Sequence, residues 1–357
     1  MVNSKKRIEH LDGIRGFAIL LVVFFHAYAR WPSYLSFVSE TKNIFIFQYG
    51  FLGVQLFFMI SGFVIFMSLD KSDGILDFMR KRWIRLFPIM LISSLLVFVT
   101  ASFFSERPAG IPGITDLIPG LIFIHPEIVS KILGMKIISL EGAFWSIYVE
   151  MMFYVFSCVI YFVFGRRFIL KSIFIAFSIS YIFVVINKLT GIDVSVSKVV
   201  NVIGFSNYGW FFIGCFIYEK INGRVNKADH LMMVIVIFCN LSFAYNDISK
   251  LVFMICILCF FCYSFYSHRI KVIFTSKFFV FFGLVSYPLY LIHENMMVAS
   301  TVKLLNLNYM NPYLTPLVSI FIITLVSYLI LKLEPKLKVA MIKIIYWNNF
   351  LIRVIYR

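Results

Sequence analysis

Charged residues are scarce in this sequence. Asp, Glu, Lys and Arg make up 14% of its 357 residues, whereas soluble proteins carry about 25%. Hydrophobic residues make up 61%, more than the interior of a soluble domain of this length can bury. The composition therefore excludes a soluble fold and predicts a chain that lies largely within a membrane.

Cysteine is also sparse, at six residues, and nothing in the sequence indicates a disulfide framework. Cys256, Cys259 and Cys262 are regularly spaced inside an apolar segment. A zinc site needs about four ligands, and no His lies nearby in the sequence. We interpret the three cysteines as small apolar core residues and expect no metal site.

Long apolar runs recur along the chain, each long enough to cross a bilayer as a helix of about 20 residues. They predict an all-α, polytopic membrane protein with about ten transmembrane helices. Residues 1–335 form one transmembrane domain in this interpretation. The predicted spans are 12–31, 47–69, 83–104, 142–164, 168–187, 201–219, 230–246, 250–267, 278–298 and 314–333.

The formal net charge of +16 indicates topology here rather than a nucleic-acid partner. With ten spans, 23 of the 33 Lys and Arg residues fall on the side of the N-terminus and 9 on the other, and Arg15 lies inside the first span. Because cytoplasmic loops collect positive charge, both termini are predicted to be cytosolic. Residues 336–357 alternate basic and apolar side chains, which is typical of an amphipathic tail lying on anionic membrane lipids.

One loop on the outer side is long, residues 105–141. It contains four prolines, which argue against one unbroken helix. Its apolar piece, 117–124, is too short to span a bilayer. We expect this piece to lie at the interface or to re-enter the membrane.

The first predicted helix carries Asp12, Arg15 and His26. Ionisable groups inside a membrane are costly and commonly functional. Arg15 and His26 are about three turns apart, so they share a face with roughly 16 Å between them along the axis. Taken singly, Arg15 is explained by snorkelling to the headgroups, and His26 by a hydrogen bond to a neighbouring helix.

Three further polar positions stand out in the later helices. Glu150 lies about two turns below the outer surface and needs a partner, for which a structural salt bridge is the simpler explanation. His293 also reaches the outer third, with Tyr290 on the same face, and an ordinary interfacial His explains it as well. Arg82 and Arg85 begin the third helix on the inner side. They are either ordinary positive-inside charge or a phosphate-binding pair.

These depths suit one chemistry. Guanidinium groups of Arg15, Arg82 and Arg85 would hold the phosphates of a cytosolic acyl-CoA, whose arm reaches inward by about the length of three helical turns. His26 is then the base for an attacking hydroxyl, because imidazole accepts protons near neutral pH. Glu150 would orient the imidazole or assist proton transfer.

The same residues resemble the acyltransferase 3 family of membrane O-acyltransferases. Five blocks occur in the family's order. They are residues 11–18 with Phe25-His26-Ala27, residues 53–63, Arg82 and Arg85 within 78–88, Trp145-Ser146 with Glu150, and Ser286-Tyr287 with Tyr290 and His293. Each block is weak alone, and together they are specific.

This resemblance implies ten helices in a bacterial inner membrane and transfer of an acyl group, foremost acetyl, from acyl-CoA to an extracytoplasmic carbohydrate or lipid-linked glycan. It implies no bound cofactor. We assign catalysis to His26 with Glu150 and Asp12, and donor binding to the three arginines. The acceptor-side candidates are Trp145, Ser146, Tyr290 and His293. Glu294 and Asn295 depart from the family, which often has an aromatic residue and Pro after this His.

Two other functions remain open from the residues alone. A transporter or flippase for a lipid-linked sugar or small acid would use intramembrane His, Glu and Arg as a relay. The sequence shows no internal repeat of the kind that many transporters have. A non-catalytic scaffold would tolerate the loss of His26. Substitution of His26 therefore distinguishes an enzyme from a scaffold, and consumption of acyl-CoA distinguishes an enzyme from a transporter.

Overall fold

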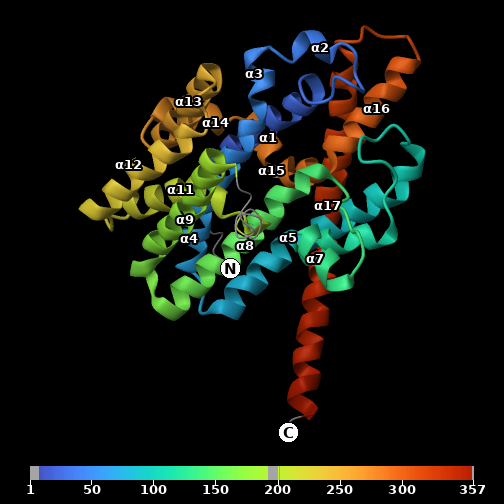
Figure 1. Cartoon of the computed structure of the whole chain (residues 1–357). Coiled ribbons are helices and arrows are strands. Elements are labelled where there is room, and N and C mark those ends of the chain that lie inside the picture. Colours follow the sequence, from blue (N-terminus) through green and yellow to red (C-terminus); the bar gives the residue numbers. More distant parts are fainter. Residues whose placement is uncertain (1–7, 192–199, 201, 356–357) are drawn as a thin grey trace. The chain divides into compact units, whose positions relative to one another are not determined.

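A computed structural model describes residues 8–191, 200 and 202–355 of the chain (Figure 1). Over these residues every regular element is helical, and none is a strand. The prediction of an all-helical membrane protein is confirmed at this level. The basic residues 5–7, Lys198 and residue 201 of the sixth predicted span lie outside the described part.

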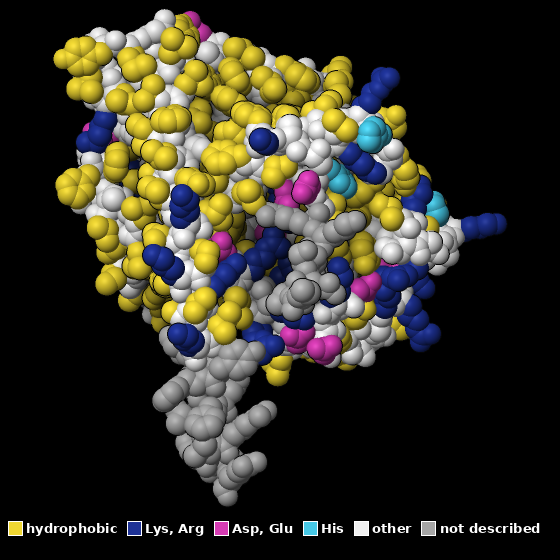
Figure 2. All heavy atoms as spheres, turned by 180° about the vertical axis from the view of Figure 1, so that it is seen from behind, with side chains coloured by type: hydrophobic (Ala, Val, Ile, Leu, Met, Phe, Trp, Pro, Cys, Tyr) yellow, Lys and Arg dark blue, Asp and Glu magenta, His cyan; other side chains and the backbone are white. Residues whose placement is uncertain are grey.

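Six helical segments among the described residues are long and apolar enough to cross a membrane. A seventh arises if α13 (Ile248–Ser264) and α14 (His268–Phe274), bent by 99°, count as one span. Figure 2 shows hydrophobic side chains over much of the visible surface, as lipid contact requires. The six segments are Glu9–Tyr28, Gly50–Leu69, Ile75–Phe103, Gly142–Phe164, Arg166–Thr190 and Thr315–Lys343.

The remaining predicted spans contain shorter helices: α11 (Tyr208–Ile221), α12 (Lys227–Ser242) and α15 (Lys277–Ile292). The ninth predicted span is also interrupted. Helix α15 ends at Ile292 and α16 (Glu294–Asn306) begins after His293. His293 therefore lies at a corner between two helices rather than within one continuous helix.

The chain divides into two compact units. The first comprises Met1–Ile75 and Trp145–Ser286, and the second comprises Leu76–Phe144 and Tyr287–Arg357. In the first unit, α1 (Glu9–Tyr28) packs on α4 (Gly53–Leu69), and α4 packs on α11 and on α8 (Trp145–Val159). Helix α9 (Ile169–Thr190) packs on α11 and α12.

Glycines allow the closest of these approaches. A Cβ added at Gly214 of α11 would lie 1.8 Å from the backbone oxygen of Met59, and one added at Gly62 of α4 would lie 2.1 Å from that of Phe211. Small residues are what lets helix backbones meet inside a membrane, where van der Waals packing drives association. The α4–α11 pair thus forms the tight centre of the first unit.

The second unit contains α5 (Ile75–Thr100) from Leu76 onward, the loop 105–141, and the helices α16 and α17 (Thr315–Ile355). Within the loop lie the short helices α6 (Leu117–Ile122) and α7 (Pro126–Leu133). Helix α16 packs on α17, where Thr301 Oγ1 donates to Ser319 Oγ at 2.9 Å. Helix α17 continues through Pro335, so the tail from 336 extends the last membrane helix without a break.

The three cysteines of α13 are not the core residues that the sequence suggested. Cys256 and Cys259 are exposed and Cys262 is half-buried. An apolar helix in a membrane meets lipid as well as protein, so an apolar environment does not require burial in the protein interior. Across the described residues, no group of three or more His, Cys, Asp or Glu side chains is arranged to hold a metal ion.

Substituting Gly214 by Ala is expected to lower the stability of the first unit by about 1–3 kcal/mol, because the new methyl group forces α4 and α11 apart. Thermal unfolding in detergent micelles measures this. Gly74→Ala is the matched control, since an added Cβ there meets nothing within 4 Å. Equal melting temperatures for both variants would contradict the role assigned to the α4–α11 contact.

Candidate active site

Helix α1 carries the first three predicted site residues on one unbroken segment. Arg15 Nη1 lies 3.6 Å from Asp12 Oδ1, and the Asp12 side chain is 7% exposed. Because a buried carboxylate must be paired, this ion pair explains how both charges are tolerated within an apolar helix. The Asp12 carboxylate thus forms an ion pair with Arg15, which lies about one helical turn further along α1.

His26 lies on the same helix and is half-buried. Its Nδ1 is 2.9 Å from the carbonyl oxygen of Val22, and its ring meets the Phe25 ring edge-on with 5.0 Å between centroids. Since a carbonyl only accepts hydrogen bonds, the neutral ring carries its proton on Nδ1. The lone pair that a base requires is then on Nε2.

Glu150 of α8 is held by two hydroxyl groups. Ser61 Oγ of α4 and Tyr154 OH both donate to its Oε1. Among the described residues these are the hydrogen bonds recorded for its carboxylate, and none comes from His26. The sequence analysis gave Ser61 and Tyr154 no role. The spacing of four residues between Glu150 and Tyr154 was a visible signal, whereas the approach of Ser61 requires the tertiary structure.

The two acceptor-side candidates at the start of α8 differ in exposure. Trp145 is 40% exposed and meets Phe58 edge-on, with 6.0 Å between ring centroids. Ser146 is buried at 7% exposure. Of the two, Trp145 presents surface to a ligand, and an aromatic face of this kind packs well against an apolar ring.

The predicted donor-binding arginines are divided between the units, since Arg15 belongs to the first and Arg82 and Arg85 to the second. Arg82 is 5% exposed, with its guanidinium carbon 5.3 Å from the ring centre of Phe78. Arg85 is exposed. The two side chains therefore occupy different environments, and a common phosphate site for all three arginines remains a prediction.

Tyr290 and His293 lie together in the second unit. Tyr290 is 7% exposed and His293 is 0% exposed. The Nδ1 atom of His293 is 2.9 Å from the carbonyl oxygen of Tyr290, and the two ring centroids are 5.4 Å apart. The contact expected from their spacing is therefore present, but the imidazole is enclosed in the protein.

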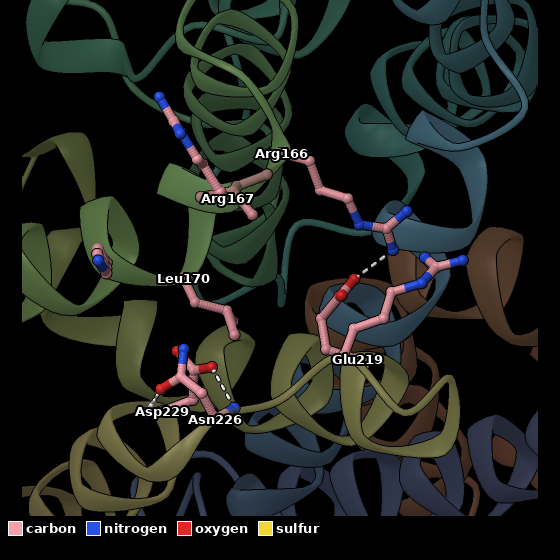
Figure 3. Close-up of a pocket in the computed structure, with 9 residues that line it drawn as sticks. Arg166, Arg167, Leu170, Glu219, Asn226 and Asp229 are labelled. Carbon is pink, nitrogen blue, oxygen red and sulfur yellow. Dashed lines mark hydrogen bonds and ion pairs between the residues drawn. The ribbon is translucent and has the colours of Figure 1, made fainter.

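A separate polar pocket in the first unit has a volume of about 370 Å³ (Figure 3). Figure 3 shows Arg166 directed at Glu219, which it contacts through Nη2, while Arg167 points elsewhere. Arg166 and Arg224 also pair with Asp70, at 2.8 and 3.3 Å. Burial tends to raise the pKa of Asp70, but hydrogen bonds from Tyr218 and Tyr161 and the charge of Arg166 outweigh it, so the pKa is lowered. These paired charges tie chain segments together.

A family model described as an acyltransferase domain matches residues 8–332. The chain belongs to this acyltransferase family. The resemblance drawn from the five sequence blocks is thereby confirmed.

Relatives of this acyltransferase share modest identity with it. It is 25% identical over 307 residues to a putative acetyltransferase, ORF330, of Acidianus two-tailed virus, covering 82% of this chain and 83% of that one. It is 28% identical over 151 residues to acyltransferase MdmB of Streptomyces mycarofaciens, covering 42% and 38%. It is 28% identical over 204 residues to O-acetyltransferase OatA of Staphylococcus aureus, covering 53% and 31%. No solved structure matches.

The second unit of the acyltransferase also contains a buried ionic cluster that the sequence analysis missed. Arg107 Nη2 donates to Glu141 Oε1 at 3.1 Å, and both side chains are 0% exposed. The backbone N–H of Asn295 donates to Glu141 Oε2 at 2.9 Å, and its side-chain amide donates to the same oxygen. The only signal in the sequence was a pair of polar residues, Glu294 and Asn295, directly after a motif His.

Burial raises the pKa of Glu141 from 4.5 to about 7, and the neighbouring charge of Glu294 adds to this. The charge of Arg107 and the hydrogen bonds from Asn295 act in the opposite direction. The folded protein therefore holds a proton on Glu141 at pH values where the unfolded chain has lost it. By linkage, this carboxyl group contributes stability below about pH 4.5 that is lost as the pH rises to about 7.

Replacing Glu141 by Gln, which mimics the protonated acid, is expected to flatten this dependence. The melting temperature of the wild type should fall more than that of Glu141→Gln as the pH is raised from about 4.5 to about 7. Thermal unfolding of both proteins at several pH values measures the difference. Parallel curves would show that Glu141 does not titrate in this window.

Proposed function

We propose that this acyltransferase moves an acetyl group from cytosolic acetyl-CoA, or another acyl-CoA, to a hydroxyl group of an extracytoplasmic sugar. The acceptor would be an O-antigen, an exopolysaccharide or a related surface glycan. Support for the group transferred comes from relatives named acetyltransferase and O-acetyltransferase. Support for the donor and acceptor comes from the residues of the five motif blocks.

The observation that carries the proposal is the arrangement along α1. One unbroken helix holds the Asp12–Arg15 ion pair near its start and His26 near its end. Their separation of about three turns, roughly 16 Å, is comparable to the reach of the CoA arm between its phosphates and its thioester. A phosphate held near Arg15 would thus deliver the thioester close to the imidazole.

In the proposed reaction, Nε2 of His26 takes the proton of the acceptor hydroxyl as its oxygen attacks the thioester carbonyl. The bond between the carbonyl carbon and sulfur breaks, the new ester forms, and the thiolate of CoA leaves. The imidazolium then returns its proton to that thiolate. The hydrogen bond from Nδ1 to Val22 fixes the ring in the required tautomer.

Around this base, the other site residues take distinct roles in the proposal. Glu150 of α8, held by Ser61 and Tyr154, would stabilise the transient imidazolium through its carboxylate. Exposed Trp145 offers a face on which a sugar ring would stack. Arg82 and Arg85 would pair with CoA phosphates.

The proposed topology has ten spans in a bacterial inner membrane, with both termini cytosolic. The distribution of Lys and Arg between the loops supports this orientation. A helix occurs within each predicted span, although several are shorter than a full crossing. An inward-facing donor site and an outward-facing acceptor site then lie on opposite sides of one bilayer.

His26→Ala is expected to reduce acyl transfer about 100-fold or more while the protein still reaches the membrane, because the general base is lost. The measurement is release of free CoA from acetyl-CoA by purified protein in nanodiscs, together with mass spectrometry of the surface glycan. His268→Ala, at an exposed His, is the control. Normal glycan acetylation in His26→Ala would refute the assigned base, and absence of thioester consumption by the wild type would favour a transporter.

The double variant Arg82→Ala/Arg85→Ala is expected to weaken acetyl-CoA binding at least tenfold, since each guanidinium removed takes away a phosphate contact. Isothermal titration with acetyl-CoA measures this in nanodiscs. Arg80→Ala/Lys81→Ala removes the same charge from the same helix, at side chains that pair with Asp77. Equal affinity in both double variants would exclude a specific role for Arg82 and Arg85.

A further inference from the structure

Polar and charged side chains gather at the corner between α15 and α16. Arg107, Glu141, Glu294 and Asn295 are 2%, 0%, 7% and 2% exposed. All four belong to the second unit. Such burial is costly unless the charged groups are paired, and the hydrogen bonds of a buried network hold its members in one arrangement. Of the Arg107 guanidinium, both terminal nitrogens are paired and Nε is not. The network therefore defines the position of whatever it joins.

This buried network joins the two ends of the loop 105–141. From the start of the loop, Arg107 reaches Glu141 and also the carbonyl oxygen of Leu140, at 2.8 Å. Its other terminal nitrogen donates to the carbonyl oxygen of Gly110 at 3.1 Å. A single guanidinium thus ties the beginning of the loop to its end.

The loop itself is internally braced. The carboxylate of Asp116 accepts from the backbone N–H of Gly113 at 2.8 Å and from that of Ile138 at 2.9 Å. These bonds link the segment before α6 to the segment after α7. Because the loop is folded onto itself, holding its ends holds its interior as well.

Helix α16 is attached to both ends of this loop by its first two residues. Asn295 donates twice to Glu141 and accepts from the backbone N–H of Ala109 at 3.0 Å. Glu294 accepts from the backbone N–H of Ala143. A Cβ at Gly142 would lie 2.7 Å from the Glu294 carboxylate, so a larger residue there would require the carboxylate to shift.

His293 immediately precedes these two anchored residues. It occupies the cap position of α16, is fully buried, and makes its Nδ1 contact to the carbonyl of Tyr290 at 2.9 Å. With Glu294 and Asn295 fixed on one side and Tyr290 on the other, the imidazole has little freedom. The same anchors thus set both the outer loop and the His of the last motif block.

We propose that Arg107, Glu141, Glu294 and Asn295 form a clasp that positions the loop 105–141 and His293 for acceptor binding and transfer. This inference rests on the proposed function, because it gives the loop 105–141 and His293 a role in acceptor binding for that reaction. The four are positioning residues, since they act through the loop and the imidazole and do not touch the reacting atoms.

The chain offers a matched control for the clasp. Lys303 of α16 pairs with Glu106 of the loop at 3.7 Å, with side chains 45% and 26% exposed. This ion pair joins the same two segments at the surface, where such pairs contribute little. Substitution of Lys303 therefore tests whether any link between the segments suffices or whether the buried clasp is required.

The experiment compares Glu294→Ala, Glu294→Gln, Asn295→Ala and Lys303→Ala as full-length protein in nanodiscs. Hydrogen–deuterium exchange of residues 105–141 and 293–300 reports the clasp, whatever the reaction is. Transfer from radiolabelled acetyl-CoA to de-O-acetylated surface polysaccharide of the host strain gives kcat and both KM values. Each variant is measured beside the wild type.

Glu294→Ala and Asn295→Ala are expected to speed exchange in the loop at least tenfold. They should lower kcat or raise the acceptor KM at least tenfold, with the acetyl-CoA KM within twofold of wild type. Glu294→Gln still accepts from Ala143 and should stay within threefold, as should Lys303→Ala. This pattern separates a positioning role from general destabilisation, which would also alter donor KM.

Three results would overturn the inference. Unchanged exchange in Glu294→Ala and Asn295→Ala would remove the clasp. Faster exchange with wild-type kinetics would make the clasp structural only. Impaired transfer with unchanged exchange would mean that Glu294 or Asn295 acts directly. If the wild type transfers no acetyl group, the proposed function is wrong. The exchange data then still show whether Glu294 and Asn295 hold the loop in place.

Discussion

Polar groups in an apolar surrounding must find their partners within the protein, and this constraint determines most of what is specific in the chain. The Asp12–Arg15 pair in α1, the hydroxyl groups of Ser61 and Tyr154 on Glu150, and the Arg107–Glu141 pair all satisfy it. Each of these interactions holds its side chains in place, because leaving one of the buried groups unpaired costs several kcal/mol. The proposed chemistry uses groups that are already held in this way.

Two kinds of contact hold the described helices at their positions. Between α4 and α11, glycines let the two backbones come together, and Cys215 Sγ donates to the carbonyl oxygen of Gly62 at 3.4 Å. In the loop 105–141 and at the start of α16, hydrogen bonds of charged and amide groups hold the segments together. The α4–α11 contact thus depends on steric fit, whereas this part of the second unit depends on hydrogen-bonded polar groups.

The proposed reaction divides naturally between these environments. The base and its conjugate acid belong to helix α1, where the hydrogen bond to Val22 sets the tautomer of His26. The residues proposed to place the acceptor belong to the loop and the α15–α16 corner. In such a division, the loop 105–141 could change without altering helix α1, since loops tolerate change better than the elements they join.

The sequence by itself determined the membrane class, the helical fold, the family and the placement of Asp12, Arg15 and His26 along one helix. The membrane class, the helical fold and the placement of the three residues follow from composition and from the period of the α-helix, which are local properties. The family follows from the five motif blocks. Only the tertiary structure decided that Ser61 meets Glu150, that the ninth span breaks at His293, and that Glu141 binds Arg107 and Asn295. Those contacts join residues far apart in the chain, and no local pattern encodes which distant partner satisfies a buried group.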